Sequence, residues 1–256
     1  MLALILLTGC DRLDAAGDVV DGLGDTTVVQ GIFLGAEIPF GIELPDDAGI
    51  YTSFCKVFLA QVSDANDVTD APVSGADVAF VSQETGKLGF DETDDGEYRL
   101  YSQDGLVYEP GQTAKLQFSL GNETGSLSVT APEAPEFDLD NEGTSQEAQK
   151  VKVTSGRFQN LVVAVYDLDR DKLTWDNLPD DFESGVELND EDAEPIDELI
   201  VPGEAFPRGS TYLVGVGGLE VGDATEFEGV NQALSAFGAG RMTLHMIEIT
   251  GANAKP

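Results

Sequence analysis

The chain has 256 residues, of which 48 are acidic and 13 are Lys or Arg, so its formal net charge is −35. Nucleic acid and anionic lipid head groups repel such a surface, which argues against both as direct partners. Hydrophobic residues make up 41% of the chain, which excludes a protein that is disordered throughout. The 29 glycines, against three Met and one Trp, favour a turn-rich β protein.

The start of the chain carries an export signal. Residues 2–7 form an apolar run that is far too short to span a bilayer, which takes about 20 residues, and that is typical of the end of a signal peptide. The run leads into the motif Leu7, Thr8, Gly9 and Cys10. This motif resembles the bacterial lipobox, in which the peptide is cleaved before a cysteine that is then diacylated. No Lys or Arg precedes the run, so we expect the true start codon to lie upstream.

The lipobox resemblance implies a protein anchored in the bacterial envelope through diacylglyceryl-Cys10. The leaflet, and the choice between a periplasmic and an outer-surface location, stay open. Composition then divides the chain into segments. We expect a truncated signal peptide over 1–9, a lipidated flexible tether over 10–26, a β-sandwich domain over 27–135, an acidic linker over 136–149 and a second β-rich domain over 150–251. A helix with one apolar face is the alternative for the tether.

Alternating apolar and polar residues predict strands in the first domain. Residues 113–120 and 126–131 alternate on either side of a Gly-bounded polar loop, which predicts a β-hairpin. Residues 76–81 alternate as well, and turn residues stand at 93–96 and at 110–111. Several short strands with turns between them indicate a β-sandwich, which we expect to fold on its own.

Part of this domain resembles a known family. The residues that carry the likeness are the stretch 73–78, Gly86, the stretch 93–100 and the pair 110–111. They resemble a carboxypeptidase-regulatory-like, transthyretin-like domain over about residues 70–131. The resemblance implies a β-sandwich with Tyr98 and Leu100 in its core, and it carries little information on function. The predicted fold class is therefore all-β, with two immunoglobulin-like or transthyretin-like sandwich units.

The second domain shows further strand patterns but no family resemblance. Strands are expected at 161–166, 199–201, 211–216 and 241–249, and a short helix is expected over 231–237. A second sandwich is the favoured interpretation. The alternative is that both halves of the chain share one continuous sheet system.

Two single residues invite a catalytic interpretation that the sequence does not support. Cys55 alternates with Val57 and Leu59 in an apolar strand, so we expect it to be a small buried hydrophobe. His245 is the only histidine and lies 190 positions away, and no G-x-S-x-G motif accompanies it. We expect His245 to be an ordinary strand residue.

Three acidic residues at alternate positions raise the possibility of a cation site. Asp167, Asp169 and Asp171 follow an apolar strand, and carboxylate oxygens at this spacing can converge on Ca²⁺. The EF-hand pattern fails, because Lys172 stands where its Gly belongs and Leu178 where its Glu belongs. An acidic loop is the favoured interpretation, and a Ca²⁺ site is the alternative.

These features predict a non-catalytic envelope protein with a binding, adhesion or scaffolding role. Its expected partners are the membrane, through Cys10, and an unidentified envelope protein or glycan. No cofactor is expected apart from the Ca²⁺ alternative. The competing functions are a calcium-dependent surface module and, less favoured, a carboxylate-based hydrolase.

Overall fold

The computed structural model describes residues 26–37, 52–62, 72–140, 142–156, 158, 160–177, 196–232 and 235–251. Its regular structure in these ranges consists of β-strands and short 3₁₀ turns, so the predicted all-β fold class is confirmed. Within these ranges no helix has the length and apolarity needed to cross a membrane.

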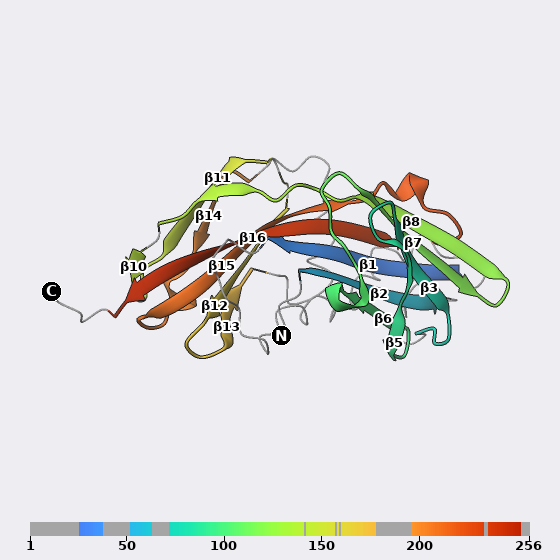
Figure 1. Cartoon of the computed structure of the whole chain (residues 1–256), viewed down its shortest axis with the longest axis horizontal. Helices are drawn as coiled ribbons and strands as arrows, with labels where there is room; N and C mark the ends of the chain where they lie inside the picture. The colour runs from blue at the N-terminus through green and yellow to red at the C-terminus, as the bar shows by residue number, and fades with distance from the viewer. Residues whose placement is uncertain are drawn as a thin grey trace.

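One long sheet runs through the whole molecule (Figure 1). In spatial order its strands are β13 (Lys172–Asp176), β12 (Asn160–Asp167), β15 (Ser210–Val221), β16 (Ala236–Thr250), β1 (Thr26–Glu37), β2 (Ser53–Val62), β6 (Glu97–Tyr101) and β5 (Asp91–Asp94). A ninth strand, β10 (Glu142–Thr144), pairs with the end of β16. Most neighbours are antiparallel, but β1 and β10 both run parallel to β16.

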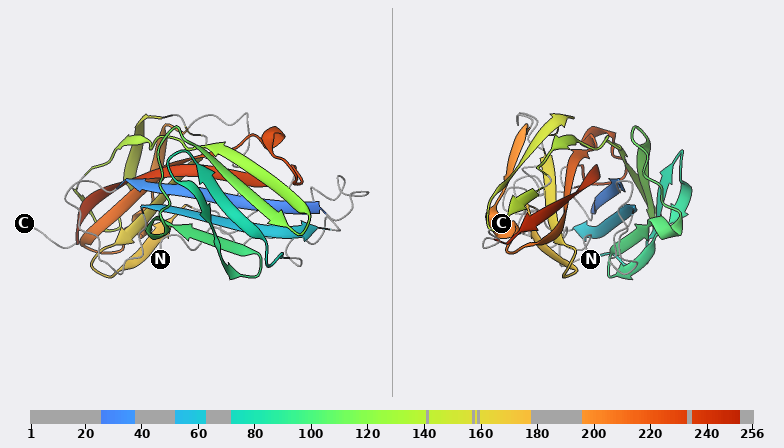
Figure 2. Two further views of the ribbon diagram at one scale, coloured as in Figure 1. Left: turned by 45° about the vertical axis from the view of Figure 1, so that its right-hand side comes forward. Right: turned by 60° about the vertical axis from the view of Figure 1, so that its left-hand side comes forward.

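Two smaller sheets pack against the same face of the long sheet. The four-stranded sheet has the order β4 (Gly86–Gly89), β3 (Asp77–Ser82), β7 (Thr113–Leu120) and β8 (Glu123–Thr130). The three-stranded sheet has the order β14 (Glu198–Val201), β11 (Gln149–Ser155) and β9 (Glu136–Asp138). Figure 2 shows the two sheets over different parts of the long one, which gives the molecule two sandwich-like halves.

Each half has its own hydrophobic core. The first core lies between the four-stranded sheet and strands β1, β2, β6 and β16, and includes Phe33, Phe80 and Leu116. The second core lies between the three-stranded sheet and strands β12, β15 and β16, and includes Val151 and Val214. It also includes Phe206, which directly follows the 3₁₀ turn η3 (Gly203–Ala205). Because alternate residues of a strand face the same side, β16 contributes to both cores along its length.

Most predicted strands are present. The hairpin, the strand at 77–82, and the second-half strands at 160–167, 198–201 and 210–221 match the expected positions. Turns occur at 95–96 and 110–111, where Gly96 and Gly111 have φ of 69° and 78°, values that favour glycine. Tyr98 and Leu100 are 1% and 3% exposed, as expected for core residues.

Two expectations need correction. The predicted helix over 231–237 is wrong: Ala236 and Phe237 begin β16, and Phe237 is fully buried in the first core because its strand pairs with β1. The predicted linker, 136–149, contains β9 and β10. The two halves also share one sheet, as the alternative interpretation stated, because β15 and β16 are long enough to extend across both cores.

Candidate functional site

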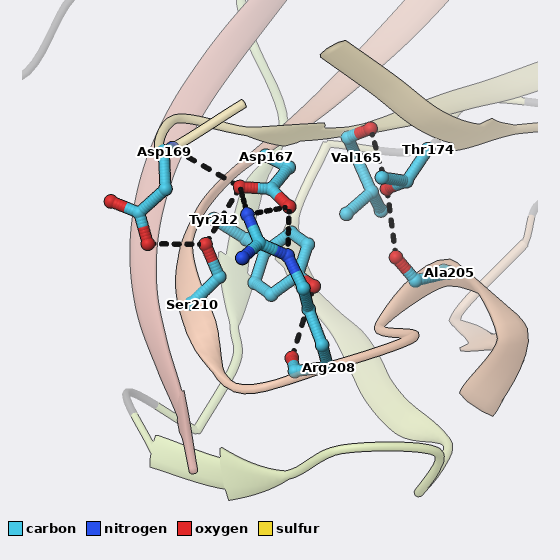
Figure 3. Close-up of polar contacts among 8 residues, drawn as sticks. All are labelled: Val165, Asp167, Asp169, Thr174, Ala205, Arg208, Ser210 and Tyr212. Carbon is cyan, nitrogen blue, oxygen red and sulfur yellow. Dashed lines mark hydrogen bonds and ion pairs between the residues drawn. The ribbon is translucent and has the colours of Figure 1, made fainter. Parts of the chain in front are cut away.

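The three predicted Asp ligands lie at one end of the second half. Asp167 is the last residue of β12, and Asp169 and Asp171 follow in the turn before β13. The Asp167 side chain is only 1% exposed, and both of its carboxylate oxygens accept hydrogen bonds. Figure 3 shows its surroundings.

Arg208 supplies the positive charge opposite Asp167. Its Nε and Nη2 lie 3.0 and 2.9 Å from Asp167 Oδ2, and Nη2 also lies 3.2 Å from Oδ1. Ser210 Oγ donates to Asp167 Oδ1 at 2.6 Å, and the backbone N–H of Asp169 donates to the same oxygen at 3.1 Å. A planar guanidinium on a buried carboxylate is a strong, directional ion pair.

The other two Asp side chains turn to different partners. Asp169 Oδ2 lies 2.6 Å from Ser210 Oγ, so this hydroxyl lies between two carboxylates and can donate its single proton to either one. Asp171, with a positive φ of 51°, accepts a hydrogen bond from the Tyr166 hydroxyl. Across the described ranges, no group of three or more His, Cys, Asp or Glu side chains is arranged to hold a metal ion. Asp167 is engaged by Arg208, and the three carboxylates do not converge on one point.

The environment of Asp167 sets its protonation. Burial alone raises its pKa, but hydrogen bonds from Ser210 and Arg208, together with the charge of Arg208, outweigh burial and hold the pKa below the ordinary value of 3.8. Asp167 is therefore a carboxylate at neutral pH, and the pair with Arg208 is ionic.

The backbone of Arg208 is fixed by a separate hydrogen bond. Its backbone carbonyl accepts a hydrogen bond of 3.0 Å from the Tyr212 hydroxyl, and Tyr212 is fully buried. Thr174 Oγ1 on β13 donates to the carbonyl of Ala205 at 2.7 Å. Together these contacts tie the segment between β14 and β15 to the end of β12 and to β13. Arg208 was not identified from the sequence, because 41 positions separate it from Asp167 and no local pattern joins them.

A second ionic network joins β2 and β6 on the outer face of the long sheet. Lys56 Nζ lies 2.7 Å from Glu97 Oε2, and Arg99 Nε donates to Glu97 Oε1 at 2.7 Å. Burial raises the pKa of Glu97, but the hydrogen bonds and charges of Lys56 and Arg99 outweigh it and lower that pKa. Lys56 and Arg99 are directly opposite each other on paired strands, so Glu97 also offsets their mutual repulsion.

Cys55 and His245 occupy structural positions. Cys55 is fully buried in the first core, as predicted, and burial raises the pKa of its thiol. His245 lies on β16 opposite Val214, and its ring is 5.9 Å from that of Phe137 in an edge-on arrangement.

Tyr98 joins the segments that carry the family resemblance. Its hydroxyl donates to the carbonyl of Val73 at 3.1 Å and accepts from the N–H of Ala76 at 3.0 Å. The stretches 73–78 and 93–100 are thus in direct contact through this side chain. Leu7, Thr8, Gly9 and Cys10 lie outside the described residues, so lipidation stays a prediction.

Comparison with known proteins yields no family. No family model matches the chain, and no curated protein matches it. Among solved structures, the FN1-FN3 domains of chicken CNTN1 are 12% identical, with a TM-score of 0.25 over 77% of this chain and 61% of theirs. A BSP domain of a biofilm-associated protein is 10% identical, with a TM-score of 0.23 over 89% and 30%. The complex of Dpr11 IG1 with DIP-gamma IG+IG2 is 9% identical, with a TM-score of 0.21 over 88% and 98%.

Proposed function

We propose that this protein is a lipid-anchored component of the bacterial envelope, held in the membrane by Cys10, whose β body binds or scaffolds another envelope component without catalysing a reaction. One observation carries the proposal: the apolar run 2–7 ends on the Leu7-Thr8-Gly9-Cys10 motif. The anchor would precede the first described strand, β1, by 15 residues, which reach at most about 50 Å when fully extended.

The arrangement of polar side chains supports a binding or scaffolding body over an enzyme. Asp167, Arg208 and Ser210 are engaged with one another, as are Lys56, Glu97 and Arg99. These groups join strands and turns of the same molecule, which is a structural use of charge. The fully buried Cys55 has the raised thiol pKa of an unreactive core residue.

Lipidation is tested by growing bacteria that produce the chain behind a full-length signal peptide in medium with a labelled fatty acid. We expect label on the wild-type protein and on Cys55→Ala, and none on Cys10→Ser, which should also leave the membrane fraction. Cys55→Ala is the matched control because it removes the other thiol of the chain. Equal labelling of wild type and Cys10→Ser would overturn the anchor.

The non-catalytic role is tested with purified residues 11–256 and a panel of glycan and ester substrates. We expect no turnover above that of the heat-denatured protein. Turnover that disappears with a single Asp or Glu substitution would replace the proposal by the carboxylate-hydrolase alternative.

A further inference from the structure

The parallel pair β1–β16 joins the N-terminal end of the body to its second half. Eight residue pairs are in register, from Gln30 opposite Ala236 to Glu37 opposite Thr243. In the order of the long sheet, β1 lies between β16 and β2, so the strands of the second core reach β1 through β16. The start of β1 and the end of β16 lie at opposite ends of the molecule (Figure 1). Along the strands this distance is about 60 Å at about 3.3 Å per residue.

We propose that the β1–β16 pair is a shear clamp, which resists tension applied between the N-terminal end of the chain and the second half. Tension from these two ends pulls β1 and β16 in opposite directions along their common axis. All eight pairs then carry the force at the same time and must break together. Strands pulled apart from one shared end separate one pair after another, which takes far less force at the same number of bonds.

Side-chain packing in the first core opposes sliding of β1. Gly31 and Gly35 leave two slots on the core face of β1. A Cβ at Gly31 would lie 2.6 Å from Leu116 Cδ1, and one at Gly35 would lie 2.4 Å from Tyr108 Cγ, so core side chains fill both slots. Phe33 lies between the slots, with ring centroids 4.8 Å from Phe80 and 4.7 Å from Tyr108.

The slots make a shift in register costly. A shift that keeps the same side chains facing the core moves a strand by two residues, because side chains alternate between faces. When β1 is pulled toward its N-terminus, Phe33 would have to enter the Gly31 slot, which Leu116 and Phe237 already occupy. A non-glycine residue would likewise meet the Tyr108 ring at the Gly35 slot. Sliding therefore requires the core to open along with the backbone pairing.

The clamp would serve a protein that is held at Cys10 and binds its partner with the second half, and this use rests on the proposed function. The mechanical property itself belongs to the described strands and is measured on the purified chain. Failure of lipid labelling and failure of the clamp are therefore separate results.

The test is single-molecule pulling of residues 10–256 in two geometries. In the first, handles are attached to the native Cys10 and to Pro256→Cys, which loads β1–β16 in shear. In the second, handles are attached to Cys10 and to Glu226→Cys. Glu226 is exposed in the 3₁₀ turn η4 (Ala224–Glu226). The segment between this turn and β16 is joined to the start of β1, because Asn231 N donates to Thr27 O at 2.9 Å, so this geometry pulls both strands from one end. The buried Cys55 stays unlabelled.

We expect the unfolding force in the first geometry to exceed that in the second about twofold or more at the same loading rate, since forced unfolding is governed by the barrier along the pulled coordinate. The fold is the same in both proteins, and matching thermal melts confirm that neither handle site disturbs it. Equal forces, or a lower force in the first geometry, would overturn the clamp.

Discussion

The Asp167–Arg208 pair is the clearest example of how single residues stabilise this fold. The carboxylate is nearly inaccessible, whereas the Arg208 side chain is 33% exposed, so solvent screens only one side of the pair. Removing the guanidinium leaves a buried charge with only the Ser210 hydroxyl and one backbone N–H as donors. The cost of such a change comes mainly from the group left behind.

We therefore predict that Arg208→Met lowers the free energy of unfolding by about 2–3 kcal/mol at neutral pH. Lys150→Met is the matched control, because it breaks the exposed pair of Lys150 with Glu198 and should cost less than about 1 kcal/mol. Arg208→Lys should recover only part of the loss, since an ammonium lacks the fork of donors. Urea denaturation of the three variants measures these differences, and equal losses for Arg208→Met and Lys150→Met would contradict the prediction.

The same pair predicts a pH dependence with a defined sign. The folded-state pKa of Asp167 is depressed below its ordinary 3.8, so its stabilising contribution is complete above that value and is lost as pH falls through the folded-state pKa. The gap in stability between wild type and Arg208→Met should thus be constant near neutral pH and shrink below about pH 4. A gap that widens on acidification would contradict this sign.

At the scale of elements, β16 decides how the two halves depend on each other. Phe237 and Ala239, from its first part, are fully buried in the first core, whereas Ile247 and Ile249 belong to the second core. Phe227, which precedes β16 by several residues, also packs in the first core. The first half is therefore incomplete without a segment that lies about 100 residues later in the chain than its own last strand.

This dependence reverses the expectation that residues 27–135 fold alone. We predict that this fragment shows no cooperative thermal transition, because it lacks the β16 partner of β1 and two aromatic side chains of its core, Phe227 and Phe237. Residues 26–251 should melt cooperatively under the same conditions. Circular dichroism with a temperature ramp measures both, and a sharp melt of the short fragment would show that β16 is dispensable.

At the scale of the whole molecule, charge opposes compactness. With a formal net charge of −35, the acidic side chains outnumber the cations by far, and the ion pairs among the described residues engage only a few of them. Folding brings these charges closer together than they are in the extended chain, so mutual repulsion destabilises the folded state more than the unfolded one.

We predict that the melting temperature of residues 11–256 rises as NaCl increases from 0.01 M to 0.15 M. Over this range the Debye length falls from about 30 Å to about 8 Å, which screens the repulsion. Ca²⁺ at equal ionic strength should add nothing further. A melting temperature independent of NaCl would contradict the electrostatic argument, and a saturable extra gain with Ca²⁺, reversed by chelator, would support the calcium alternative.

The sequence by itself determined the features that depend on neighbouring residues. Strand alternation, glycine turns and the burial of Cys55 could all be predicted, because the two-residue period of a strand and the backbone freedom of glycine are local properties. The same local reasoning failed at 231–237, where pairing with β1 makes Ala236 and Phe237 part of a strand.

Only the tertiary structure decided which distant segments meet. The parallel pairing of β1 with β16 joins residues about 206 positions apart, and the ion-pair partner of Asp167 proved to be Arg208, 41 positions away. Many strands here have similar apolar faces, so alternation alone does not select partners or register. Selection comes from how side chains fill the cores: Tyr108 over Gly35, and Leu116 with Phe237 over Gly31, fit one register of β1.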